Sequence, residues 1–166
     1  MHLPSILSLG LAGFTVAAPS ALDKRESFNG VGQIRAQWRE GDYADLGCLT
    51  NAGKWTVDET LCGNFTATPF PGSFIYSYSL ETDSGPCYTY GASIVCDNGN
   101  TGYPTIFGLW PWPNAIPNTP SLRVGNYGLM ATHGNNPPTI EEGPQSVHFV
   151  TYSEKGKWVW LTWKAL

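Results

Sequence analysis

Polar and apolar side chains alternate with a period of two along several stretches of this chain. Residues 33–39 and residues 73–80 alternate in this way, which is typical of strands that are buried on one face only. The 166 residues also include 19 Gly and 13 Pro, and these residues divide the chain into short segments. The pattern therefore predicts an all-β fold, a compact β-barrel or sandwich of about 8–10 short antiparallel strands.

Two stretches near the C-terminus, residues 146–152 and 157–164, are rich in β-branched and aromatic residues and predict a hairpin. The second stretch is apolar on both faces, so we expect a central strand that is covered on both sides. We also expect two short strands within residues 88–95, turning at a glycine, and one strand over residues 122–132. Only residues 58–61 favour a turn of helix.

The chain has four cysteines, Cys48, Cys62, Cys87 and Cys96. An even number of cysteines in an exported chain predicts two disulfides, for which three pairings are possible. We favour Cys48–Cys62 with Cys87–Cys96, because these pairs close short loops that are rich in turn residues. The spacing matches no zinc pattern, and we expect no metal site and no cofactor. A glycosylation sequon begins at Asn64.

The N-terminal residues are typical of an export signal. Residues 1–18 form an apolar stretch that ends in small residues, which predicts a signal peptide. Residues 19–25 predict a short pro-segment that ends at the dibasic pair Lys24 and Arg25. A single secreted β domain would then cover residues 26–166. The apolar stretch is shorter than the roughly 20 residues of a membrane span, so we expect an extracellular protein without such a span.

The charge pattern disfavours polyanionic partners. The formal net charge is −4, and no cluster of basic residues is present in the sequence. Nucleic acids and anionic membranes are bound by clustered Lys and Arg. We therefore expect neither as a partner.

Catalytic residues are not marked by any motif. The best candidates are His133, Glu141, His148 and Arg123, which supply the types of a general base, a general acid and a cation. They make a small secreted ribonuclease or other hydrolase one alternative function. Glu141 and Glu142 are adjacent, so in an extended segment they point to opposite sides, which is wrong for a pair acting on one glycosidic bond.

A proline-rich segment at residues 98–120 carries aromatic residues that are candidates for a binding surface. Tyr103, Trp110 and Trp112 could present ring faces to a sugar or to a protein groove. The other interpretation is that these rings cover an open end of the barrel. The first interpretation predicts a cell-wall carbohydrate-binding protein, with a wall polysaccharide as the partner.

Several stretches together resemble a known group of proteins; they are Leu46-Gly47-Cys48-Leu49-Thr50, Gly53-Lys54-Trp55-Thr56, residues 61–67 and residues 153–166. They are similar to small secreted proteins of filamentous ascomycete fungi, including elicitors that induce a hypersensitive response in plant cells. The resemblance implies a compact β-barrel that acts outside the cell as a virulence effector sensed by a plant host. It assigns no catalytic or binding residue. Our leading prediction is therefore a non-enzymatic fungal effector or elicitor whose partner is an unidentified host surface component.

Overall fold

The structure is a computed structural model that describes residues 28, 30–39, 41–70, 77–99, 107–109, 116, 119–124, 128–132, 134, 136–150 and 158–166. The described residues form strands and one short 3₁₀ turn, η1 (Glu59–Leu61). The strands are β1 (Gly30–Trp38), β2 (Asp45–Leu49), β3 (Trp55–Thr56), β4 (Phe65–Pro69), β5 (Ser77–Thr82), β6 (Gly85–Tyr90), β7 (Ser93–Cys96), β8 (Phe107–Leu109), β9 (Leu122–Arg123), β10 (Leu129–Thr132), β11 (Val147–Val150) and β12 (Val159–Ala165). The predicted all-β class is thus confirmed.

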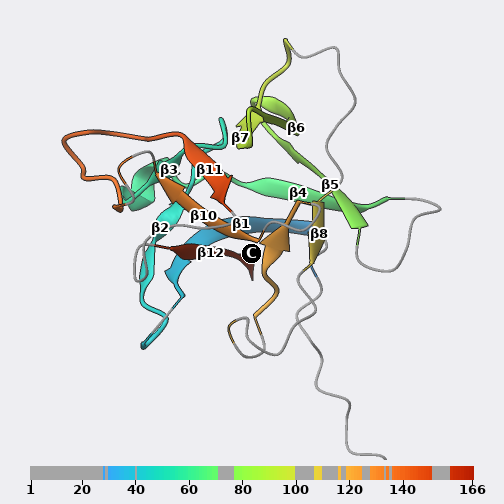
Figure 1. Cartoon of the computed structure of the whole chain (residues 1–166). Coiled ribbons are helices and arrows are strands. Elements are labelled where there is room, and N and C mark those ends of the chain that lie inside the picture. The colour runs from blue at the N-terminus through green and yellow to red at the C-terminus, as the bar shows by residue number, and fades with distance from the viewer. Residues whose placement is uncertain are drawn as a thin grey trace, which may run out of the picture.

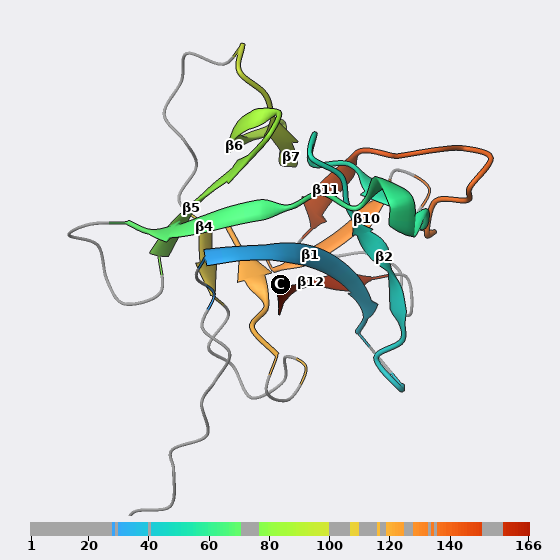
Figure 2. The ribbon, with the colours of Figure 1, turned by 180° about the vertical axis from the view of Figure 1, so that it is seen from behind.

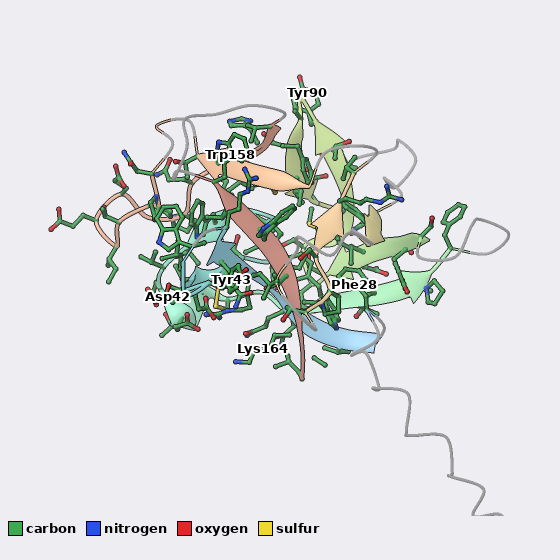
Figure 3. All side chains as sticks on the ribbon, turned by 60° about the horizontal axis from the view of Figure 1, so that its bottom comes forward. Phe28, Asp42, Tyr43, Tyr90, Trp158 and Lys164 are labelled. Carbon is green, nitrogen blue, oxygen red and sulfur yellow. A yellow bond between two sulfur atoms is a disulfide. The ribbon has the colours of Figure 1, made fainter. Side chains whose placement is uncertain are left out.

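Eight of these strands close into a ring, which makes the fold a barrel. Each strand pairs antiparallel with the next in the order β1, β12, β10, β11, β7, β6, β5 and β4, and β4 pairs back with β1. The strands β2 and β3 extend the sheet beyond β1, while β8 and β9 extend it beyond β5. Figure 1 shows the β6–β7 hairpin standing out at one end of the molecule, and the reverse view in Figure 2 agrees. Tyr90, at the end of β6, lies at the tip of this hairpin (Figure 3).

The core follows from the alternation along the strands. Ile34 and Ala36 of β1 point inward, opposite Trp163 and Leu161 of β12, and all four are buried. Trp163 also packs against the ring of Phe28, with centroids 4.5 Å apart. Burying such large aromatic side chains contributes about 2–3 kcal/mol each, so this layer is a main source of stability.

Several predicted elements are confirmed. The disulfides are Cys48–Cys62 and Cys87–Cys96, and the second one staples the predicted hairpin over residues 88–95, formed by β6 and β7. The single helical turn follows Asp58, whose side chain caps it. The strand β12 is central, between β1 and β10, and residues 159–163 are buried on both faces.

Two predicted elements are wrong. The C-terminal hairpin does not form, because β10 lies between β11 and β12 and pairs antiparallel with both, which makes β11 and β12 parallel to each other. The single strand over 122–132 is two strands with different partners: β9 pairs with β8, and β10 pairs with β11 and β12. The strand predicted over 73–80 is described only from Ser77, as β5.

Candidate functional site

An open groove of about 520 Å³ lies where four segments meet, beside the Cys48–Cys62 disulfide. The segments are the β2–β3 turn, η1, the β5–β6 turn and the turn before β11. In both ribbon views the β2–β3 hairpin and η1 lie beside the segment that leads into β11 (Figures 1 and 2). The groove is lined by Thr50, Asn51, Ala52, Lys54, Thr60, Leu61, Cys62, Ser84 and Pro144.

The β2–β3 turn owes its shape to local hydrogen bonds. The Thr50 amide donates to the Lys54 carbonyl at 2.8 Å, and the Gly53 amide donates to the Thr50 carbonyl at 2.8 Å. Gly53 has a φ of +80°, a conformation that is strained for residues with a Cβ. The turn therefore presents Thr50, Asn51, Ala52 and Lys54 to the groove in a fixed arrangement.

Asn51 connects the turn to the other groove segments. Its Oδ1 accepts a hydrogen bond from the Asn64 amide at 3.0 Å, and its carbonyl accepts one from Thr82 Oγ1 at 2.6 Å. A Cβ on Gly63 would lie 2.5 Å from the Asn51 amide nitrogen, so the absence of a side chain there allows this close approach. The groove walls are consequently held by the hydrogen bonds of Asn51 and by a disulfide.

The groove combines neutral polar groups with the apolar surface of Ala52, Leu61 and Pro144. Thr50, Asn51, Thr60 and Ser84 contribute hydroxyl and amide groups, and Lys54 is the one charged residue of the described lining. Asp58 lies on the same turn as Thr60 and accepts hydrogen bonds from the Thr60 hydroxyl and amide. These two bonds lower the pKa of Asp58, which keeps a negative charge beside the groove.

A cluster of charged residues connects η1, which lines the groove, to β1 and β2. Arg35 is only 6% exposed, and its guanidinium donates to Asp45 at 2.9 Å and to Glu59 at 2.8 Å. Its Nη1 also lies 3.3 Å from Cys62 Sγ. The hydrogen bond to Glu59 raises the pKa of Arg35 and lowers the pKa of Glu59, so both groups stay charged. These hydrogen bonds connect β1, β2 and η1 next to the Cys48–Cys62 disulfide.

His148, one of the predicted catalytic candidates, belongs to the barrel wall. It is half-buried on β11 directly opposite Ser93 of β7, and Ser93 Oγ lies 2.6 Å from His148 Nδ1. This is the single residue pair in register between β7 and β11, and the Phe149 amide adds a hydrogen bond to the Ala92 carbonyl. The side-chain contact therefore helps to close the ring of strands.

The other predicted site residues are dispersed where the structure describes them. Glu141 is exposed in the turn at residues 140–142, and the carboxylate of Glu142 accepts a hydrogen bond from the Thr139 amide. Arg123 lies on β9, opposite Gly108. The remaining predicted residues lie outside the described residues: His133, Tyr103, Trp110, Trp112, Lys24 and Arg25.

Two global features of the described residues bear on the choice of site. No three His, Cys, Asp or Glu side chains among them come close enough to hold a metal ion. In the same part of the chain, no helix has the length and hydropathy needed to cross a bilayer. The groove is the candidate site that we consider further, because four segments of the described structure meet there.

The sequence interpretation did not single out the groove. Apart from Cys48, residues 46–50 and 53–56 were named only for the resemblance, although they lie on either side of the β2–β3 turn. A turn between two strands inside a disulfide loop was the one local signal that could have marked it. The contribution of Ser84 and Pro144 follows only from the folded chain.

Comparison with known proteins gives one family. The search of curated proteins and the search of solved structures found no match. A family model described as the RNase T2-like C-terminal domain matches residues 26–110, just over half of the chain. The matched residues run from the first described strand through β8, and they include both disulfides and most of the groove. The match gives no support to the elicitor type and points to a ribonuclease-like family instead: the chain belongs to the RNase T2-like C-terminal domain family.

Proposed function

We propose that this chain is a secreted, non-catalytic binding domain, and that its groove binds a neutral, hydroxyl-rich polymer such as a wall polysaccharide. The observation that carries the proposal is the groove lining, in which hydroxyl and amide groups are held by a disulfide and by backbone hydrogen bonds. Such pre-organised polar groups can pair with sugar hydroxyls at a low cost in side-chain entropy. The exposed side chain of Leu61 adds an apolar surface for the C–H face of a sugar.

Charge favours a neutral ligand over RNA. The groove has one cation, Lys54, and the carboxylates of Asp58 and Glu59 lie on the adjoining turn. Binding to a phosphate backbone gains most of its free energy from several clustered cations. The overall negative charge of the chain also disfavours binding to a phosphate backbone.

The positions of the described catalytic candidates favour a non-catalytic role. General acid–base catalysis needs its groups at one reacting bond, whereas His148 lies on β11, Arg123 on β9 and Glu141 in an exposed turn. The family is named for the C-terminal domain of RNase T2-like proteins, so the match concerns that domain. These points support binding rather than bond cleavage by this chain.

Ribonuclease activity is the second candidate, and the family match favours it. It would use the residues predicted from sequence: His148, Arg123, Glu141 and His133. A zymogram on RNA with the purified chain decides between the two candidates. We expect no cleared band; a cleared band that disappears in the His148→Ala variant would establish the ribonuclease.

Location outside the cell is part of the proposal. It rests on the signal-like residues 1–18 and the dibasic pair Lys24-Arg25, and the two disulfides support it because disulfides persist in oxidising compartments. The family match begins at Glu26, the residue that cleavage after Arg25 would leave first.

The binding experiment is retention of the purified chain on insoluble chitin, β-glucan and cellulose. We expect one of these polymers to retain it, and we expect Lys54→Ala and Ser84→Ala to weaken the retention. Trp110→Ala and Trp112→Ala test whether the aromatic segment adds to the same surface. Retention on none of the polymers would contradict the proposal.

A further inference from the structure

The sequon at Asn64 is presented outward by the strand that follows it. Asn64 and Thr66 are exposed, while Phe65 between them is completely buried in the barrel. This alternation is the normal period of a strand, and β4 begins at Phe65. The two side chains that define the sequon therefore lie on the same outer face, and the folded barrel leaves both accessible.

Among the described contacts, none that stabilises the fold involves the side chain of Asn64. The residue is held through its backbone amide, which donates to Asn51 Oδ1 at 3.0 Å. No described hydrogen bond uses the side-chain amide of Asn64 or the hydroxyl of Thr66. A sugar attached to Asn64 Nδ2 would consequently break no contact that stabilises the fold.

Asn64 also lies at the rim of the groove. Its hydrogen-bond partner Asn51 lines the groove, and so does Cys62, two residues earlier in the chain. Leu61 of the same segment lines the groove and is 45% exposed. The first sugars of a glycan on Asn64 would therefore extend from the edge of the groove.

From this geometry we infer that Asn64 carries an N-linked glycan, and that this glycan limits access to the groove. The modification itself needs only export and the accessible sequon. The effect on access rests on the proposed function, since it requires the groove to bind a polymer. A glycosylated chain would then bind short or terminal segments of a polymer more readily than the middle of a long chain.

The modification is tested by expressing the full chain, with its own N-terminal segment, in a yeast host and measuring the intact mass of the secreted protein. We expect a glycan that an endoglycosidase removes down to the first sugar. Asn64→Gln and Thr66→Val should abolish it, Thr66→Ser should retain it, and Thr68→Val on the same strand should leave it unchanged. Secreted protein with the unmodified mass would overturn the inference, and so would a chain that is not exported.

The effect on the groove is tested by comparing the polymer retention of the glycosylated and the trimmed protein. Trimming to the first sugar leaves the charge at Asn64 unchanged, so a change in retention reports access alone. We expect several-fold stronger retention after trimming, and equal retention would contradict the placement at the rim. If neither form is retained, the proposed function fails while the mass measurement still decides the modification.

Discussion

At the scale of single residues, Arg35 is the least expected feature of this protein. Its place in the alternation of β1 assigns it to the polar outer face, and it does point to that face, away from Ile34 and Ala36. It is nevertheless buried, because the Cys48–Cys62 loop brings Glu59 to it and the start of β2 supplies a second carboxylate, Asp45. Burying a guanidinium is favourable only when its donors are paired, as they are here.

Replacing Glu59 by Gln should lower stability in a pH-dependent way. Arg35 lowers the pKa of Glu59 in the folded state, so the ionised carboxylate stabilises the fold above the unfolded pKa of about 4.3. That contribution is lost as the pH falls through the folded pKa. Because Glu59 is largely exposed, we expect a loss of only about 1 kcal/mol at about pH 7.

Denaturant unfolding at neutral pH and at about pH 3 checks this expectation. The difference between wild type and Glu59→Gln should shrink at the lower pH. Glu141→Gln, in an exposed turn, is the matched control and should change stability little at either pH. A difference that persists unchanged at the lower pH would rule out the ion pair as its cause.

Gly47 is a second residue whose role can be measured. Its φ is +100°, and a Cβ there would lie 2.0 Å from the Thr56 carbonyl oxygen. We expect Gly47→Ala to cost about 3 kcal/mol, because the β2–β3 pair must move apart. Gly41→Ala, at φ +78° with open space around its Cβ, should cost about 1 kcal/mol from backbone strain alone. Thermal unfolding separates the two, and equal losses would disprove the steric argument.

At the scale of elements, the alternation along β1 and the cysteine spacing were sufficient to predict a strand, a stapled hairpin and two disulfides. Both depend on residues that are close in sequence. The C-terminal hairpin was predicted on the same local grounds and is wrong, because β10 inserts between β11 and β12. Which strand inserts between two others is decided by the packing of the whole barrel, and no local period carries that information.

The contact between β7 and β11 should be the weakest joint in the ring. It has one pair in register, Ser93 with His148, whereas β1 and β12 share seven. The free energy of local opening rises with the number of contacts that must break. We therefore expect the Phe149 amide, which bonds across this joint, to exchange with solvent faster than the paired amides of β1 and β12.

Native-state hydrogen exchange followed by NMR measures this order directly. Ser93→Ala should increase the exchange of Phe149 further while leaving the β1–β12 amides unchanged. Equal protection of the two joints in the wild type would show that the barrel opens only as a whole.

At the scale of the whole molecule, the family match and the barrel have different extents. The match ends at residue 110, but the ring of eight strands needs β10, β11 and β12, which lie beyond it. We expect a fragment of residues 26–110 to remain unfolded, since β1 would lose its longest partner, β12. Circular dichroism with thermal melting compares it with residues 26–166. A cooperative melt of the fragment would contradict this view of the domain.

The groove belongs to the same scale, which explains why sequence reasoning did not find it. Thr50 and Asn51 look like ordinary turn residues, and Ser84 and Pro144 are far away along the chain. Only the closed barrel brings these segments to one place. The sequence-based candidates, by contrast, were chosen by residue type, and the described ones are dispersed between the barrel wall and exposed turns.

A binding isotherm tests the proposed function most directly. It measures how strongly a variant with a filled groove binds the wall polysaccharide that retains the wild-type chain. Ala52→Trp fills the groove from an exposed position whose backbone contact to Cys96 does not involve the side chain. Thr68→Trp, on the exposed face of β4 and outside the groove, is the matched control. We predict at least about tenfold weaker binding for Ala52→Trp, a loss of about 1.4 kcal/mol, and unchanged binding for the control. Equal binding by both variants and the wild type would show that the groove is not the site.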